Sequence, residues 1–205
     1  MPYTAKHKQQ SREKILKSAI DCFTERGFEN TSIDEIMQRA EMTRGAFYAH
    51  FSSKSELYQQ ALLNGANNSQ LLKLKPNEVS DREWMNLLVK GYLSEHHIQQ
   101  KQPPCPLAFL VTDVAVSEPE VRKTYTKIFK GMSEKMHSIA KSYSNCDESR
   151  VYAITAMLIG AVAIGRALDK REIRQTMLSA CETLALSLLN GEMVEESRQK
   201  KTSAN

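Results

Sequence analysis

Apolar residues recur at helical spacing along almost the whole chain, which is the pattern of amphipathic and buried helices. In the first third we expect a helix over about 11–26, two short helices within 32–51, and a fourth helix from Ser53 towards Leu74. Only six prolines and eight glycines interrupt the 205 residues. The pattern therefore predicts an all-α protein, with further helices over about 81–100, 107–114, 117–143, 151–168 and 172–189.

The stretch 32–51 predicts a short helix, a tight turn and a second short helix. Ser32, followed three residues later by Glu35, is the signature of a capping box. Phe47 and Phe51 face inward on the second helix, so a polar face is left for solvent. Such a face can enter the major groove of DNA and donate to phosphates and base edges, whereas the alternative is a plain αα-hairpin. The outward residues are Thr43, Arg44, Gly45, Tyr48 and His50.

Two motifs in this region are G-F-x-x-T-S-I-x-x-I from Gly27 and A-x-M-T-R-G-A-F-Y-x-H-F-x-S-K-x-E-L from Ala40. They resemble the N-terminal domain of the TetR/AcrR family of bacterial transcriptional regulators over roughly residues 11–62. The resemblance implies a three-helix helix-turn-helix DNA-binding domain followed by a helical ligand-binding and dimerisation domain. The expected boundaries are 1–60, with a basic arm at 1–10, then 61–191, and a charged tail at 192–205.

The resemblance also assigns DNA-binding roles to eight residues. Thr43 and Arg44 are the candidates for base edges, because arginine commonly reads guanine O6 and N7. Gly45 would let the helix backbone approach the DNA closely. The remaining candidates, placed for phosphates, are Tyr48, His50, Lys54, Thr31 and Ser32. Ala49 departs from the family pattern, since many relatives carry tyrosine or histidine there, and one phosphate contact is therefore in question.

Two helices near the C-terminus combine small residues with a regular apolar stripe. Because small residues let helices approach closely, two such helices and their symmetry mates can form a four-helix bundle and a C2 dimer. The alternative is that both helices pack inside one monomer. The resemblance favours the dimer, in which two recognition helices about 34–36 Å apart would meet successive major grooves of a palindrome. The expected interface residues are Ile154, Leu158, Val162, Met177, Cys181, Leu184 and Leu188.

Methionine and aromatic side chains beyond residue 80 form a candidate ligand site. At helical spacing such residues are usually core, but thioethers and flat rings also suit a ligand cavity. The resemblance favours a cavity, because relatives bind small molecules in this part of the chain. The candidates are Trp84, Tyr92, Phe109, Tyr125, Phe129 and Met132.

Cys105 lies between two prolines at an expected helix start, where the helix dipole lowers the pKa of a thiol. The segment C-P-L-A, followed by S-E-P-E-V-R, resembles the C-terminal domain of some TetR-family members. In one of them a cysteine at a comparable place senses electrophiles and reactive chlorine. Cys105 is therefore a candidate sensor with Cys146 as a candidate resolving partner, and an inert buried thiol is the alternative.

Charge and apolar content indicate which binding partners and which cellular location to expect. The net charge of +4 permits a nucleic-acid partner without requiring one. Residues 1–10 are polar and basic, unlike a secretory signal. The longest apolar run, 151–165, is shorter than the ~20 residues that span a bilayer. We therefore expect a cytoplasmic protein with no membrane partner.

The sequence predicts no metal site, cofactor or catalytic centre. The four cysteines lie far apart, so free thiols are expected in a reducing cytosol. His96 and His97 are adjacent and would point about 100° apart on a helix, which disfavours a shared ion. Because no phosphate-binding loop, triad-like spacing or clustered acid pair is visible, we do not expect an enzyme.

These features together predict a dimeric, DNA-binding transcriptional regulator. Repression is the expected mode, with release from a palindromic operator by an unknown small-molecule effector or by modification of Cys105. The alternative is a helical ligand-binding or dimerisation protein that does not bind an operator, which the departure at Ala49 supports.

Overall fold

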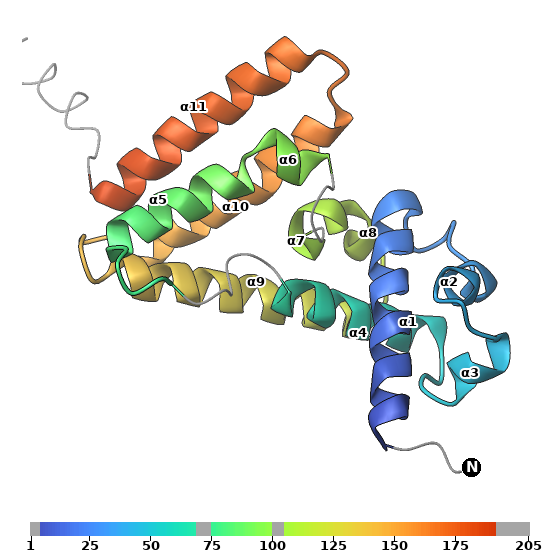
Figure 1. The fold of residues 1–205 in the computed structure, drawn as a ribbon. Helices are drawn as coiled ribbons and strands as arrows, with labels where there is room; N and C mark the ends of the chain where they lie inside the picture. The colour runs from blue at the N-terminus through green and yellow to red at the C-terminus, as the bar shows by residue number, and fades with distance from the viewer. Residues whose placement is uncertain (1–4, 69–74, 100–104, 192–205) are drawn as a thin grey trace, which may run out of the picture. The chain divides into compact units, whose positions relative to one another are not determined.

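The structure is a computed structural model that describes residues 5–68, 75–99 and 105–191. Every regular element in these ranges is a helix (Figure 1), which confirms the all-α prediction. The helices are α1 (Ala5–Arg26), α2 (Ile33–Arg39), α3 (Arg44–Tyr48), α4 (Lys54–Asn67), α5 (Asp81–Tyr92), α6 (Glu95–Ile98), α7 (Pro106–Phe109), α8 (Val111–Ala115), α9 (Pro119–Ala140), α10 (Glu148–Ala167) and α11 (Arg171–Asn190).

The helices group into two compact units, which are described separately. The first unit takes in the described residues of 1–74 and 95–131, and the second those of 75–94 and 132–205. This division differs from the expected boundary near residue 60. The reason is packing: Leu110, Val114 and Val121 are buried in the same apolar cluster as the side chains of α1 to α4.

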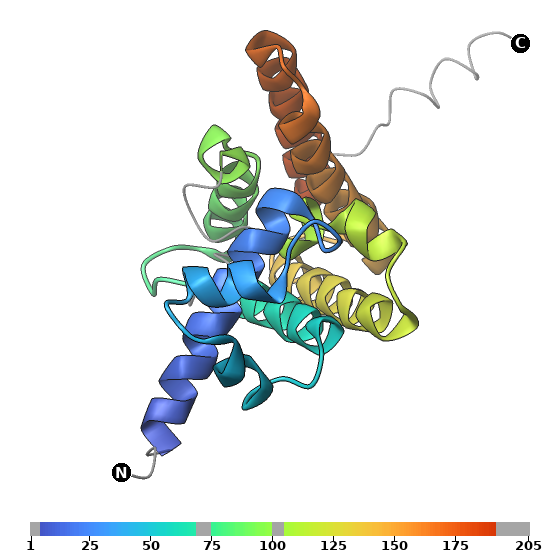
Figure 2. The same cartoon turned by 90° about the vertical axis from the view of Figure 1, so that its right-hand side faces the viewer.

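The core of the first unit forms where α1 and α4 pack together, with α2 beside α1 and α3 against α2 (Figure 2). Ile15, Ala19 and Phe23 recur every four residues along α1 and are completely buried, so one stripe of the helix faces the core. The Tyr58 ring of α4 meets the Phe23 ring edge-on, with centroids 4.7 Å apart. This aromatic contact adds to the packing of α1 against α4.

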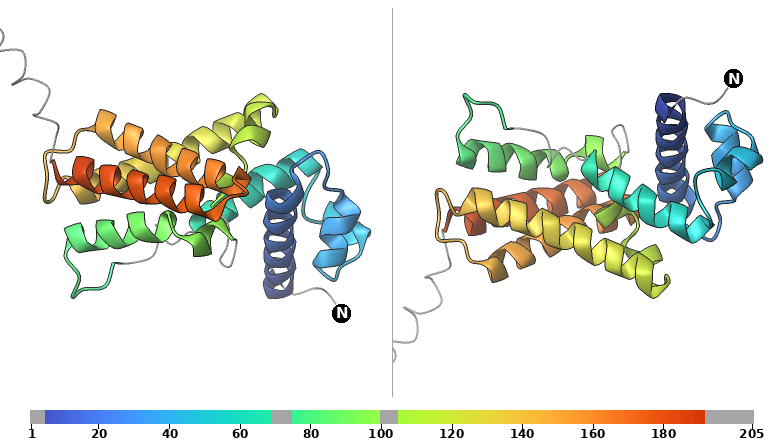
Figure 3. Two further views of the ribbon diagram at one scale, coloured as in Figure 1. Left: turned by 90° about the horizontal axis from the view of Figure 1, so that it is seen from above. Right: turned by 90° about the horizontal axis from the view of Figure 1, so that it is seen from below.

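The second unit is built on α10 and α11, which pack side by side with α5 against them (Figure 3). Ile154, Leu158 and Val162 of α10 are at most 1% exposed within the single chain. We therefore correct their assignment: they are core residues of one subunit, and they have no surface left for a partner. The burial of these side chains also explains why α10, although long and apolar enough to cross a membrane, is a core helix here.

Several helix ends differ from the expected ones. Helix α1 begins at Ala5 rather than near Ser11, so the described part of the basic arm is helical. Helix α4 ends at Asn67, and its predicted continuation over 69–74 lies outside the described residues. The single helix expected over 81–100 is divided into α5 and α6.

Candidate nucleic-acid interface

The helix-turn-helix is formed by local interactions at the start of α2 and between α2 and α3. The Ser32 hydroxyl accepts from the Glu35 N–H at 3.1 Å, and the Ser32 N–H donates to the Glu35 carboxylate at 2.8 Å. The predicted capping box is therefore confirmed. Glu41 has a φ of 58°, a left-handed backbone that turns the chain sharply between the two helices.

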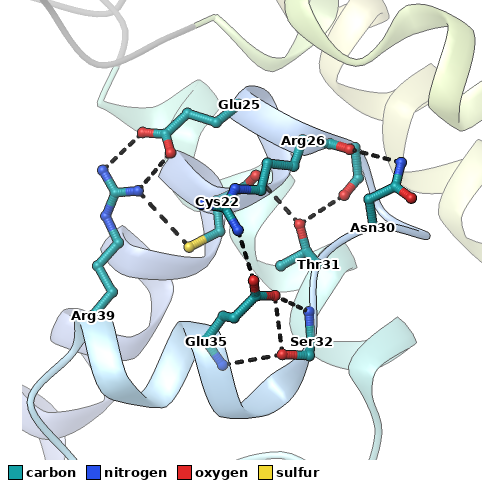
Figure 4. Close-up of polar contacts among 9 residues, drawn as sticks. Cys22, Glu25, Arg26, Asn30, Thr31, Ser32, Glu35 and Arg39 are labelled. Atoms are coloured by element: carbon teal, nitrogen blue, oxygen red, sulfur yellow. Dashed lines mark hydrogen bonds and ion pairs between the residues drawn. The ribbon is translucent and has the colours of Figure 1, made fainter.

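Two exposed ion pairs orient α2 against α1 (Figure 4). Both terminal nitrogens of the Arg39 guanidinium lie 2.8 Å from the Glu25 carboxylate, and hydrogen bonding to Arg39 lowers the pKa of Glu25. The Arg26 guanidinium lies 2.6 Å from Glu35. Because exposed pairs contribute little to stability, we assign them to the orientation of α2.

Two predicted phosphate contacts are used inside the fold instead. Thr31 is 1% exposed, and its hydroxyl donates to the Gly27 carbonyl at 2.7 Å. Its assignment to DNA was wrong, because the chain folds back over the end of α1. Ser32 is exposed, but both its hydroxyl and its N–H donate to Glu35, so its donors are engaged in the helix cap.

Helix α3 presents the polar face that the sequence predicted. Thr43, Arg44 and Gly45 are exposed, and Tyr48 is 59% exposed, whereas Phe47 is completely buried. Thr43 stands at the N-cap position, but within residues 5–68 its side chain makes no capping hydrogen bond. The hydroxyl is therefore not committed to the start of the helix.

Arg44 is held by a neighbour on α2. Its guanidinium lies 2.9 Å from the Asp34 carboxylate, and both side chains are largely exposed. Interactions with Tyr48 and then with Asp34 raise the pKa of Arg44. The guanidinium of Arg44, the candidate base-reading group, is thus positioned by residues of both α2 and α3. Its ion pair with Asp34 was not predicted from the sequence.

A basic cluster lies beside the C-terminal end of α3. Arg12 of α1 donates to the His50 carbonyl at 3.3 Å and lies 4.5 Å from the centre of the Phe51 ring. Burial, and then the charges of Lys8 and Arg12, lower the pKa of half-buried His50. Lys8 and Arg12 are one turn apart on α1. Lys8 lies within the basic arm expected at 1–10 and Arg12 just beyond it, but their position beside His50 was not predicted.

Lys54 stands at the start of α4, as predicted, and its ammonium group lies 4.2 Å from the centre of the Phe28 ring. Ser53 and Glu56 have the spacing of a capping box, but only one of its two hydrogen bonds forms. Ser53 accepts from the Glu56 N–H, but the Glu56 carboxylate accepts from the hydroxyl and the N–H of Ser52. Local competition between two adjacent serines decides which one pairs with the carboxylate.

The candidate ligand residues are divided between the two units. Phe109, Tyr125 and Phe129 are partly buried in the first unit; in the second, Trp84 is partly buried, and Tyr92 and Met132 are buried. The Tyr125 hydroxyl donates to the Leu107 carbonyl at 2.7 Å. Burial, and then Cys105, raise the pKa of Tyr125.

Cys105 is 6% exposed and stands at the N-cap of α7, a helix of four residues. The expected helix start is present, but the helix is too short for a substantial dipole. The burial of Cys105 favours the alternative of an inert buried thiol. Cys146 is also buried, and burial raises the pKa of its thiol.

The remaining predicted interface residues lie on α11 and keep some exposed surface. Leu184 is 48% exposed, and Met177, Cys181 and Leu188 are partly exposed. A shallow open groove follows the same helix. It is lined by small residues and one leucine: Thr176, Ser179, Ala180, Thr183, Leu184 and Ser187.

The fold and this exposed recognition helix define a helix-turn-helix DNA-binding protein. The family model for bacterial regulatory proteins of the tetR family matches residues 15–61. The chain is 31% identical over 99 residues to the HTH-type transcriptional regulator SrpR of Pseudomonas putida, a match that covers 48% of this chain and 46% of SrpR. It is also 31% identical over 99 residues to the uncharacterized HTH-type transcriptional regulator TtgW from a strain of the same species, covering 48% of this chain and 73% of TtgW.

The chain belongs to the TetR family of transcriptional regulators, as its sequence motifs predicted, and it is a regulator rather than an enzyme. The chain matches about half the length of SrpR.

Solved structures show the same fold over most of the chain. A TetR-family regulator from Agrobacterium tumefaciens has a TM-score of 0.72 at 18% identity, covering 88% of this chain and 97% of that one. The reduced form of E. coli NemR has a TM-score of 0.69 at 18% identity, covering 85% and 96%.

Proposed function

We propose that the protein is a homodimeric, cytoplasmic repressor that binds a palindromic operator through α3 of each subunit. The exposure of Thr43, Arg44 and Tyr48 around the buried Phe47 carries this proposal. A helix anchored by one aromatic side chain and polar on its outer face is suited to reading base edges. The alternative, a helical protein that does not bind an operator, explains neither the polar face of α3 nor the ion pair that links Arg44 to Asp34 of α2.

The phosphate contacts are proposed for Tyr48, His50 and Lys54, together with Lys8 and Arg12. The last two extend the basic surface from α3 along α1, beside His50. Contacts of this kind hold the protein on the duplex and make binding dependent on salt, because each one releases counterions from the DNA.

Dimerisation is proposed through the exposed faces of α10 and α11. Ile164, Ile173 and Leu184 are apolar and about half exposed, and the small residues of the α11 groove would allow a second copy to approach closely. The resulting C2 axis would place the two copies of α3 about 34–36 Å apart, one turn of DNA.

Release from the operator is proposed as a population shift. In one state the two helix-turn-helix domains fit the operator, and in the other they are displaced from it. An effector that binds more tightly to the displaced state would lower operator affinity. The size of that decrease is limited by how much more tightly the effector binds one state than the other. Within the first unit, the candidate contacts for an apolar effector are Phe109, Tyr125 and Phe129. No zinc or other cofactor enters this proposal.

The base-reading role of Arg44 is tested by Arg44→Ala. We expect discrimination at one operator position to fall by about 1–3 kcal/mol, because a bidentate arginine–guanine contact would be lost. The measurement is fluorescence anisotropy with duplexes enriched from a random library, each varied at one base pair. Lys8→Ala is the control: it should weaken all duplexes alike and reduce the salt slope by about one. Equal loss on every duplex with Arg44→Ala would contradict base reading.

Sensing by an effector is favoured over sensing by Cys105, because a buried thiol reacts slowly. We therefore expect brief treatment with hypochlorite or a quinone to leave operator binding unchanged, both in the wild type and in Cys105→Ser. Anisotropy before and after treatment measures this. If treatment released the wild type from the operator but not the Cys105→Ser variant, Cys105 would be the sensor.

A further inference from the structure

Helix α8 contributes one carboxylate to the end of α1. The Asp113 carboxylate accepts from the Phe28 N–H at 2.5 Å, across 85 residues of sequence. This N–H follows the last turn of α1, where intrahelical hydrogen bonding has ended. A bond to an ionised acceptor is stronger than a neutral one, so Asp113 holds this turn firmly.

The turn itself is shaped around that carboxylate. Gly27 has a φ of 79°, and a Cβ built on it would lie 3.0 Å from the Asp113 Oδ1 atom. Glycine therefore serves two needs here, the left-handed backbone and the close approach of the carboxylate. The same turn leads directly to Thr31, whose hydroxyl bonds back to Gly27 just before α2 begins.

Asp113 also lies next to α4. Burial first, and then the charge of Asp113, raise the pKa of the Tyr58 phenol. The Tyr58 ring packs against the Phe28 ring, with centroids 4.9 Å apart. A second link lies nearby, where the Ser55 hydroxyl donates to the Glu118 carboxylate at 2.8 Å. Asp113 and Glu118 thus contact the turn that follows α1 and the start of α4, the two segments that flank the helix-turn-helix.

From these contacts we propose that Asp113 is a positioning residue for operator binding. It acts through the Gly27–Phe28 turn, which sets where α2, and with it Asp34 and Arg44, lies relative to α1. The inference rests on the proposed function, because it concerns the same DNA interface. It places a determinant of operator affinity on α8, outside the helix-turn-helix motif.

The test compares Asp113→Ala and Asp113→Asn with Glu120→Ala, a matched control. Glu120 is exposed and pairs with Lys123, three residues along α9. All three variants remove one negative charge, which by electrostatics alone should strengthen binding to DNA. We expect Asp113→Ala instead to weaken operator binding by about tenfold or more, as the loss of a charged hydrogen-bond acceptor implies. Asp113→Asn should recover part of the affinity, because an amide oxygen still accepts from the Phe28 N–H.

Hydrogen exchange of the DNA-free protein supplies a second readout. Asp113→Ala should speed amide exchange over residues 27–40 relative to Glu120→Ala, while α10 stays protected. If Asp113→Ala matches Glu120→Ala in both affinity and exchange, the inference is overturned. If the wild type binds no duplex although exchange over 27–40 responds to Asp113→Ala, the operator proposal fails and the positioning of the turn by Asp113 stands.

Discussion

Leu184→Glu is expected to separate the two subunits and to lower operator affinity by about 100-fold or more. A dimer binds a palindrome tightly because, once one helix-turn-helix domain is bound, the second is held at a high effective concentration near its half-site. That gain disappears when the two domains are no longer linked. A carboxylate buried in the interface without a partner costs too much for the dimer to persist. Leu184 is the substitution site because it is 48% exposed on the α11 groove and leaves the core of the single chain intact.

The matched control is Leu87→Glu on α5, where the leucine is 55% exposed. It makes the same chemical change at a similar exposure, on a helix that is not part of the proposed interface. Sedimentation velocity and operator anisotropy should show a monomer with weak binding for Leu184→Glu, and an unchanged dimer for Leu87→Glu. A dimer that survives Leu184→Glu would rule out this face of α11 as the interface.

Phe47→Ala is expected to destabilise the helix-turn-helix by about 3–5 kcal/mol, the usual cost of removing a fully buried phenylalanine. Phe47 is the buried residue of a helix only five residues long. A helix of that length has little stability of its own, so its position depends on this one side chain. We expect the helix-turn-helix domain to unfold and operator binding to be lost at 37 °C.

The neighbouring residue separates stability from recognition. Tyr48 is 59% exposed and packs edge-on against the Phe47 ring at 5.0 Å. Tyr48→Ala should therefore change the midpoint of thermal unfolding little and still weaken binding to DNA through the lost phosphate contact. Calorimetry paired with anisotropy measures both effects. Equal destabilisation by the two substitutions would show that α3 is not anchored by Phe47.

The features of the helix-turn-helix that were predicted correctly depend on residues that are close together in the sequence. The capping box of Ser32 and Glu35, the turn at Glu41 and the buried Phe47 all involve residues within a few positions of each other. Propensity and periodicity contain that information. The resemblance to known motifs added the family and the DNA-binding role, which periodicity alone does not specify.

The errors arise where distant segments decide the outcome. Thr31 looks like a surface residue until the end of α1 supplies the Gly27 carbonyl. Ile154 and its neighbours on α10 have the same stripe whether they pack inside one subunit or between two, so the spacing did not distinguish these cases. The contact between Asp113 and Phe28 spans 85 residues and has no local signature.

If Arg44 reads the operator as proposed, its ion pair with Asp34 would affect how the protein searches the genome. Before contact with DNA the nearby carboxylate partly offsets the charge of the guanidinium, so Arg44 would add less to the attraction that holds the protein on arbitrary sequence. Sliding then depends on the lysines and Arg12, whose charges do not discriminate among bases. A correctly placed guanine would offer Arg44 two acceptors in place of Asp34. On the proposed function, the pair would thereby raise the ratio of operator binding to non-specific binding.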